Sequence, residues 1–178
     1  MKCSIAKDLV DRTIDFHGHN CPGLTIGIRV SELAMEKLNI HKSPSAVCVT
    51  ETDMCAVDAI QFLTGCSFGK GNLIHKDYGK SAFTFYDRDA QKGFRAVFNS
   101  DFAGNEQDRE RRIQLLLAAD LGELFSVTQI SSAPARPARI LKSIQCDNCK
   151  EMTMESRIRL FEGKNLCIPC FQNVEQKI

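Results

Sequence analysis

Apolar residues recur at helical spacing through the first part of the chain. In residues 5–14 they return every three to four positions, the period of a short amphipathic helix. A second such pattern spans residues 24–38 and follows Pro22, which suits the first turn of a helix. Small residues lie along this second segment. We therefore predict that it packs closely.

Two shorter helical patterns follow. Residues 54–63 are mostly apolar, and Asp53 precedes them with a side chain that can cap a helix N-terminus. Residues 107–119 mix charged and apolar positions, as in a helix that covers a sheet. Asp120 and Glu123 then match the capping box of one further helical turn.

Short runs rich in β-branched and aromatic residues separate these helices and predict strands. Helices and antiparallel hairpins alternate unequally in this order, which is typical of the α+β class. We therefore predict an α+β fold with helices packed on a mostly antiparallel sheet. The predicted strands cover residues 46–51, 72–75, 82–86, 94–99 and 126–130.

A segment of small residues with two prolines divides the chain. Residues 131–139 read Ser-Ser-Ala-Pro-Ala-Arg-Pro-Ala-Arg, and proline is not tolerated inside a helix or a central strand. We therefore predict a core domain in residues 1–130, an extended linker in residues 131–143 and a small second domain in residues 144–178. The second domain is too short to fold through apolar burial alone.

Four cysteines in the second domain have the spacing of a zinc ribbon. Cys146 and Cys149 form one C-x2-C pair, and Cys167 and Cys170 form another. Each pair turns sharply enough to direct two thiolates at one point, which gives the tetrahedral sulfur set that zinc prefers. Metal binding, at about 10 to 16 kcal/mol, would stabilise a domain of this size. Disulfides, redox pairs and haem attachment are the alternatives, and the sequence around the cysteines fits each of them less well.

The composition favours a reducing compartment. The first residues carry charges and lack the apolar segment of a signal peptide, so we expect a cytoplasmic protein with reduced thiols. No run of about 18 apolar residues is present, and we expect no membrane span. The net charge is +1, and residues 134–178 hold eight Lys and Arg against five Asp and Glu. This small excess disfavours nucleic acid as a partner.

Two histidines and a cysteine lie within five positions before the second helix. If the backbone is extended there, His17, His19 and Cys21 point in the same direction, because strand side chains repeat every two residues. Their nitrogen and sulfur donors suit zinc or another transition metal. The alternative is structural, with imidazoles bound to helix ends and a small buried thiol.

Cys55 and Asp58 fall at the start of the helix predicted after Asp53. The dipole and the free N–H groups of a helix N-terminus favour a thiolate, so we expect a lowered pKa at Cys55. Asp58 shares that helix face and can orient a ligand or accept a proton. A buried core thiol is the alternative for Cys55.

A glycine-rich loop with one lysine follows this helix. Residues 65–71 read Gly-Cys-Ser-Phe-Gly-Lys-Gly, one residue too short for a nucleotide P-loop and without its Ser or Thr. We interpret the loop as a backbone nest for an anion, with Lys70 as the point charge and Cys66 facing the metal cluster. A helix C-cap explains Gly65 alone.

These motifs resemble the E-subunit family of formylmethanofuran dehydrogenase. The resemblance covers most of the larger domain and implies an α+β core, a homodimer, a metal-accessible cleft and a zinc ribbon after the core. It also implies that the protein accompanies a molybdenum or tungsten enzyme, which reduces carbon dioxide on a pterin-like carrier. For many members of the family, the resemblance implies a role without that enzyme. The motifs are Phe-His-Gly-His-Asn-Cys-Pro-Gly at 16–23, Cys-Ala-Val-Asp-Ala-Ile-Gln at 55–61, Thr-Gly-Cys-Ser-Phe-Gly-Lys-Gly-Asn-Leu at 64–73 and Asp-Tyr-Gly-Lys at 77–80.

Three functional hypotheses follow. In the first, the protein is an enzyme whose core metal ion activates water or a small one-carbon or anionic substrate. In the second, the protein is a non-catalytic metal carrier or accessory subunit: the same ligands close around the ion, and the ribbon docks onto a partner. In the third, the protein regulates nucleic acid through its ribbon. Three protein ligands plus water favour catalysis, whereas four favour storage or structure. The candidate core ligands are His17, His19, Cys21, Cys55 and Cys66, and the catalytic candidates are Cys55, Asp58 and Lys70.

Overall fold

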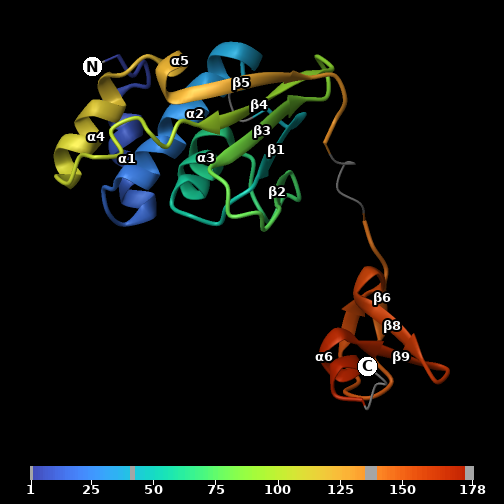
Figure 1. Cartoon of the computed structure of the whole chain (residues 1–178). Helices are drawn as coiled ribbons and strands as arrows, with labels where there is room; N and C mark the ends of the chain where they lie inside the picture. The colour runs from blue at the N-terminus through green and yellow to red at the C-terminus, as the bar shows by residue number, and fades with distance from the viewer. Residues whose placement is uncertain (1, 41–42, 135–139, 175–178) are drawn as a thin grey trace. The chain divides into compact units, whose positions relative to one another are not determined.

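The chain folds into two units, residues 1–138 and 139–178. The computed structural model describes residues 2–40, 43–134 and 140–174. The first unit combines helices with a five-stranded sheet, and the second holds two short strand pairs and a short helix (Figure 1). The boundary between the units falls within the predicted linker, of which residues 135–139 lie outside the described residues.

The helices of the first unit lie close to the predicted segments. The second is the longest, and its predicted bounds agree with those observed to within two residues. None of the described helices combines the length and the apolar character needed to cross a membrane. The helices are α1 (Lys7–His17), α2 (Pro22–Leu38), α3 (Ala56–Thr64), α4 (Arg109–Ala118) and α5 (Leu121–Leu124).

The start of α3 differs from the prediction. Asp53 is exposed and does not cap the helix, because Cys55 occupies the N-cap position with φ −47° and ψ −29°. Just before it, the Thr52 hydroxyl accepts a hydrogen bond from the Met54 N–H at 3.2 Å. Cys55 is therefore held at the very beginning of the helix.

The sheet of the first unit has the order β2-β1-β3-β4-β5. β1 and β2 are parallel, and the other neighbouring pairs are antiparallel. The predicted α+β class with a mostly antiparallel sheet is confirmed. The strands are β1 (Ala46–Thr50), β2 (Leu73–His75), β3 (Ala82–Asp87), β4 (Lys92–Phe98) and β5 (Phe125–Ile130).

One face of this sheet forms the main core with α2 and α3. Cys48 lies opposite Phe85, and Phe85 lies opposite Phe94, so the three side chains share a face of the pleated sheet. All three are fully buried, in one cluster with Val30 of α2 and Ile60 of α3. The sheet therefore fixes the positions of both helices.

Two glycines let α2 and α3 approach each other closely. A Cβ atom at Gly27 would lie 2.3 Å from the backbone oxygen of Ala56, and one at Gly23 would lie 3.2 Å from the Cβ of Cys55. The first contact is possible only without a side chain at residue 27. The small residues noted in α2 thus bring the start of α3 against the start of α2, beside Cys21.

A buried ion pair ties the N-terminal segment to α2. Arg29 and Glu32 are 1% and 2% exposed, and Arg29 Nη1 lies 2.9 Å from Glu32 Oε2. Arg29 Nη2 also donates to the Ala119 carbonyl at 2.7 Å, while Glu32 Oε1 accepts from the Ser4 N–H at 2.5 Å. Removing either partner would leave a buried charge without compensation. The pair therefore anchors segments that precede α1 and follow α4.

The second unit has little apolar interior. Its buried cluster consists of three cysteines and Leu166, with Phe161 and Phe171 packed against them. This small core agrees with a domain that metal binding stabilises. The unit contains β6 (Ser143–Gln145), β7 (Met152–Met154), a 3₁₀ turn (Glu155–Arg157), β8 (Ile158–Phe161), β9 (Lys164–Cys167) and α6 (Ile168–Gln172).

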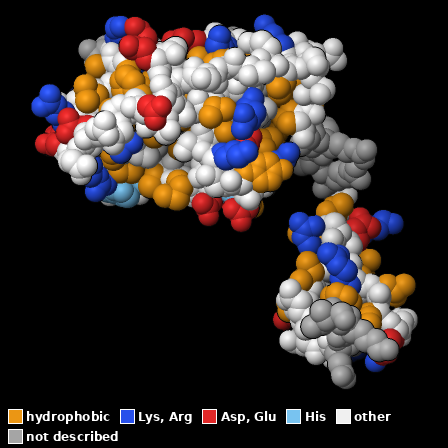
Figure 2. Space-filling model, in the orientation of Figure 1, with side chains coloured by type: hydrophobic (Ala, Val, Ile, Leu, Met, Phe, Trp, Pro, Cys, Tyr) orange, Lys and Arg blue, Asp and Glu red, His pale blue; other side chains and the backbone are white. Residues whose placement is uncertain are grey.

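The visible surface carries charges of both signs. Lys and Arg side chains are interspersed with Asp and Glu and with apolar side chains on the visible face of the first unit (Figure 2). A nucleic-acid footprint would instead gather positive charge on one face. The visible face therefore agrees with the small net charge of the chain.

Replacing Gly27 with alanine should destabilise the first unit. Alanine favours a helix by up to about 1 kcal/mol over glycine, but its Cβ would meet a backbone oxygen that no side-chain rotation can move. Over-packing of this kind typically costs about 1–3 kcal/mol, so we expect a net loss in the free energy of unfolding, measured by urea denaturation.

Gly122→Ala provides the control, because a Cβ at that position would meet no atom within 4 Å. Its stability should be unchanged or slightly higher. Equal stabilities of the Gly27→Ala and Gly122→Ala proteins would mean that the α2–α3 contact is not tight.

Candidate metal centres

Three helix ends converge at one point of the first unit. His17 is the last residue of α1, Cys21 caps the N-terminus of α2 through its side chain, and Cys55 occupies the N-cap position of α3. His19 lies in the loop between α1 and α2. One potential ligand atom from each of these four residues lies within 4.8 Å of the other three. The structure thus brings together four of the five predicted core ligands.

The backbone of residues 17–21 is not extended throughout, as the alternation of side chains in a strand would require. His17 is helical, Gly18 has φ +89°, and Cys21 is extended with φ −153°. The positive φ of Gly18 turns the chain out of α1, a role for which glycine is favoured. The imidazole rings of His17 and His19 then lie 4.5 Å apart between centroids. The donor atoms of His17 and His19 are thus brought together by the turn at the C-cap of α1, not by the alternation of side chains in a strand.

Asp58 fixes the orientation of His17. His17 Nδ1 lies 2.7 Å from Asp58 Oδ2, so the carboxylate assigns the ring proton to Nδ1. The other nitrogen, Nε2, keeps its lone pair and lies 3.9 Å from Cys21 Sγ. Metal-binding histidines usually donate their second N–H to such a carboxylate, which orients the ring and strengthens the donor. The pair therefore matches a histidine prepared to bind a metal through Nε2.

The two core thiols lie at helix N-termini. The Leu24 N–H donates to Cys21 Sγ at 3.3 Å, and the partial positive charge of a helix N-terminus favours a thiolate. Burial nevertheless raises the pKa of the Cys55 thiol, and the neighbouring Cys21 and Asp58 raise it further. The expectation of a lowered pKa at Cys55 is therefore wrong, because burial and negative neighbours outweigh the start of α3. A cation between the sulfurs would reverse that balance.

Cys66 and Lys70 lie at the other end of α3. Gly65 is the C-cap of that helix, and nine helical residues separate it from Cys55 by about 14 Å along the axis. Cys66 is fully buried in the main core, and burial raises the pKa of its thiol. The predicted ligand Cys66 therefore lies outside the four-residue group.

The loop after α3 is closed by its own hydrogen bonds. Lys70 Nζ donates to the Gly65 carbonyl at 2.6 Å, so its charge stabilises the C-terminal end of α3. The predicted anion nest is not formed, because several N–H groups of the loop are already bound. The N–H groups of Cys66, Ser67 and Phe68 donate to the side-chain oxygens of Thr64, Asn72 and Gln61, respectively.

A cleft of about 750 Å³ opens beside His19. Its opposite wall is the start of α4, where Asp108 caps the helix by accepting from the Glu110 N–H at 2.9 Å. Arg109 Nη2 donates to the Asn20 carbonyl at 3.0 Å and so ties the loop between α1 and α2 to α4. His19 is exposed, and the cleft gives small molecules access to it.

The four ribbon cysteines form the cluster that their spacing predicts. The sulfur atoms of Cys146, Cys149, Cys167 and Cys170 all lie within 4.8 Å of one another. Cys149 Sγ and Cys167 Sγ are 3.8 Å apart, which is about the separation of two sulfurs on a tetrahedral zinc ion with bonds of ~2.3 Å. The Cys167 N–H donates to Cys146 Sγ and Asn148 Nδ2 donates to Cys170 Sγ, both at 3.3 Å. Such bonds stabilise thiolates.

Hydrogen bonds and neighbouring thiols shift the pKa values of the ribbon cysteines in opposite directions. A backbone hydrogen bond from Cys167 lowers the pKa of the Cys146 thiol to about 6. A backbone hydrogen bond from Glu151 lowers the pKa of Cys149, but burial and the neighbouring thiols raise it to about 12. Four adjacent thiolates require a cation, so zinc binding would release the remaining protons and would weaken in acid.

Comparison with known families identifies both units. A family model described as "FmdE, Molybdenum formylmethanofuran dehydrogenase operon" matches residues 16–126, more than half of the chain. The chain belongs to the FmdE family. Its FmdE region contains all four residues of the core group. A prokaryotic dksA/traR C4-type zinc finger matches residues 139–176 and contains the four ribbon cysteines, so the second unit is a zinc-binding ribbon.

Two individual proteins extend the comparison. The "Probable S-adenosyl-L-methionine-binding protein" of Archaeoglobus fulgidus is 28% identical over 194 aligned residues, which cover 91% of this FmdE chain and 52% of the relative. This chain thus spans about half the length of that relative. The crystal structure of an FmdE-like protein of tungsten formylmethanofuran dehydrogenase type from Syntrophus aciditrophicus matches with a TM-score of 0.66 and 24% identity over 93% of this chain and 91% of that one. The second match shows that the two proteins share a fold.

Asp58→Ala should weaken zinc binding in the core without removing a ligand. Loss of a carboxylate that orients a metal-bound histidine typically costs about 10- to 100-fold in affinity. Competition with a chromophoric chelator measures this loss, and the ribbon zinc serves as an internal reference. Asp53→Ala is the matched control, because Asp53 is exposed and lies five residues before Asp58. An unchanged core affinity in Asp58→Ala would show that the aspartate does not orient a metal ligand.

Cys167→Ser should remove the ribbon zinc and unfold the ribbon alone. We expect zinc content to fall by one ion per chain and residues beyond about 142 to become sensitive to protease, while the first unit stays folded. Elemental analysis and limited proteolysis test both effects. Cys3→Ala, outside both clusters, should change neither. A folded ribbon without zinc would contradict the assignment.

Proposed function

We propose that the FmdE core binds one transition metal ion, zinc or a metal of similar preference, through His17, His19, Cys21 and Cys55. The observation that carries this proposal is the approach of four donor atoms to within 4.8 Å of one another. Two nitrogens and two sulfurs suit borderline metals rather than magnesium or calcium. The carboxylate on His17 Nδ1 supports the proposal, because it leaves Nε2 free to bind.

We propose further that this site holds its ion in an accessory or carrier protein. Four converging protein ligands complete a tetrahedral shell, which is typical of structural and storage sites, whereas catalytic zinc keeps one position open. The second candidate function is metal- or thiol-dependent catalysis on a small one-carbon or anionic substrate, with Cys55 and Asp58 beside the ion. The position of His19 favours it, because a molecule in the adjoining cleft could displace that exposed ligand. Lys70 has no part in either proposal, since it binds the far end of α3.

We also propose that the protein is a cytoplasmic homodimer and that it assists a molybdenum or tungsten enzyme. The family description names the formylmethanofuran dehydrogenase operon, which supports a role beside that enzyme. Exposed apolar side chains of the ribbon support docking through that unit. They are Met152, Met154 and Leu160.

Binding of S-adenosyl-L-methionine is another candidate function, and its only support is the name of the Archaeoglobus relative. The similarity covers nearly all of this chain, so a site in the shared half of the relative would be present here. Isothermal titration with S-adenosyl-L-methionine and with S-adenosylhomocysteine tests it, and absence of saturable heat would exclude it.

The double substitution of His17 by alanine and Cys21 by serine should lower the metal content by one ion per chain. The melting temperature should move little, because the large apolar core between the sheet and its helices, rather than the metal, stabilises the first unit. Elemental analysis of protein purified without chelator measures the loss, and calorimetry measures the melting temperature. An unchanged metal content would mean that His17 and Cys21 have a structural role and do not bind a metal.

Cobalt spectroscopy separates the two candidate roles of the core. Subtracting the spectrum of the double variant from that of the cobalt-loaded parent chain leaves the contribution of the core site alone. Intense visible d–d bands that stay unchanged on addition of azide would indicate four protein ligands and the holding role. Bands that change with azide would indicate a water ligand that the anion displaces, and catalysis would then become the leading proposal.

A further inference from the structure

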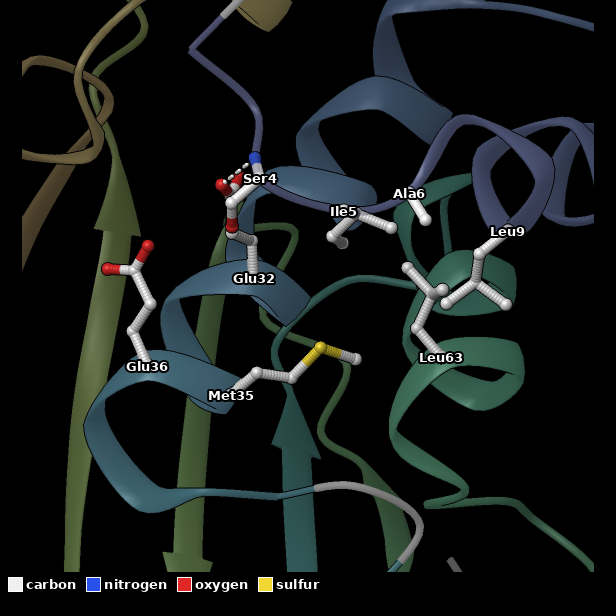
Figure 3. A pocket seen from close by; sticks show the side chains of 8 residues that line it. All are labelled: Ser4, Ile5, Ala6, Leu9, Glu32, Met35, Glu36 and Leu63. Carbon is white, nitrogen blue, oxygen red and sulfur yellow. Dashed lines mark hydrogen bonds between the residues drawn. The ribbon is translucent and has the colours of Figure 1, made fainter.

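A cavity lies under the N-terminal segment, in a place that the metal proposal does not use. It measures about 520 Å³, within the usual range of about 300–1,000 Å³ for small-molecule sites. It adjoins the C-terminal half of α2, about 20 Å along the helix from Cys21. The lining residues are Ser4, Ile5, Ala6, Leu9, Glu32, Met35, Glu36 and Leu63 (Figure 3).

The cavity has an apolar side and an acidic side. Leu9 of α1 and Leu63 of α3 form the apolar side, and Met35 of α2 extends towards them (Figure 3). Glu32 and Glu36 rise together from α2 on the other side (Figure 3). An occupant that satisfies both sides needs an apolar body and a group that complements carboxylates.

The acidic side carries one uncompensated negative charge. Glu32 is paired with the buried Arg29, although its Oε2 accepts no hydrogen bond of good geometry from the described residues. Lys2, the other cation near the two glutamates, is paired with Asp120. Glu36 is exposed and has no ion pair or hydrogen bond among the described residues. The free charge at the cavity is therefore that of Glu36.

We infer that this cavity binds an organic cation with an apolar body, such as an aliphatic amine. The body would lie against Leu9, Met35 and Leu63, where each Å² of apolar surface removed from water is worth roughly 25 cal/mol. The flexible thioether of Met35 adapts to different shapes. The ammonium group would lie beside Glu36, the exposed carboxylate of the cavity. An anion of the same shape would meet the carboxylates and be repelled.

Binding of n-hexylammonium, 1-hexanol and hexanoate to the full chain tests the inference. The three probes share an apolar body and differ in charge. We expect saturable shifts of the Met35 and Leu63 methyl signals in NMR spectra with hexylammonium, about tenfold weaker binding of hexanol, and no saturable shifts with hexanoate. Equal binding of hexylammonium and hexanoate, or no saturable shift with hexylammonium, would overturn the inference.

Two variants locate the charge and the apolar body. Glu36→Gln should weaken hexylammonium binding by about three- to tenfold, whereas Asp89→Asn, which removes an exposed carboxylate elsewhere, should not change it. Ala6→Phe should occupy part of the apolar side of the cavity and weaken binding while the chain stays folded. An unchanged affinity in Glu36→Gln or in Ala6→Phe would place the amine elsewhere and refute the site. Because the inference does not depend on the core metal, the His17 and Cys21 double variant should bind hexylammonium as the parent chain does.

Discussion

The close contact of α2 and α3 is the constraint on which the proposed core metal centre depends. Gly27 lets the backbone of Ala56 lie against α2, and that contact sets the first residues of the two helices side by side. Cys21 and Cys55 occupy the N-cap positions of those helices, so their sulfurs meet although 34 residues separate them in the sequence. The sheet contributes indirectly, since it buries the inner faces of both helices and fixes their positions.

Helix termini supply the chemistry as well as the geometry of this centre. The thiols of Cys21 and Cys55 lie at helix N-termini, where the first N–H groups have no partner within the helix. The imidazole of His17 lies at the C-terminus of α1, where Gly18 turns the chain away. Asp58 is one turn into α3 and completes the arrangement by holding His17. A cation at this point would be favoured by the two sulfurs and by the carboxylate behind the imidazole.

Local patterns in the sequence predict the elements well and the contacts between them less well. The bounds of α2, the positions of the strands along the chain and the ribbon cluster depend on periodicity and short spacings, which are visible in a single segment. Closeness in sequence to Cys55 favours Cys66 as a ligand of the metal cluster, yet a rigid helix holds the two apart. Periodicity does not reveal Arg29 and Glu32 as a buried pair, because charges in a helix usually mark its solvent face. A charged pair spaced i, i+3 in a helix whose neighbouring positions are mostly apolar or small is the available signal.

The two metal centres also differ in when they can form. Each ribbon knuckle is a chelate of two cysteines three positions apart, so even a largely unfolded chain presents two sulfurs to an ion, and binding then drives folding. The four residues proposed as core ligands lie at three helix ends and in the loop between α1 and α2, and they meet only where Gly27 lets α2 and α3 approach. Occupancy of the ribbon would therefore report the supply of metal, whereas occupancy of the proposed core site would report that the domain around it has finished folding.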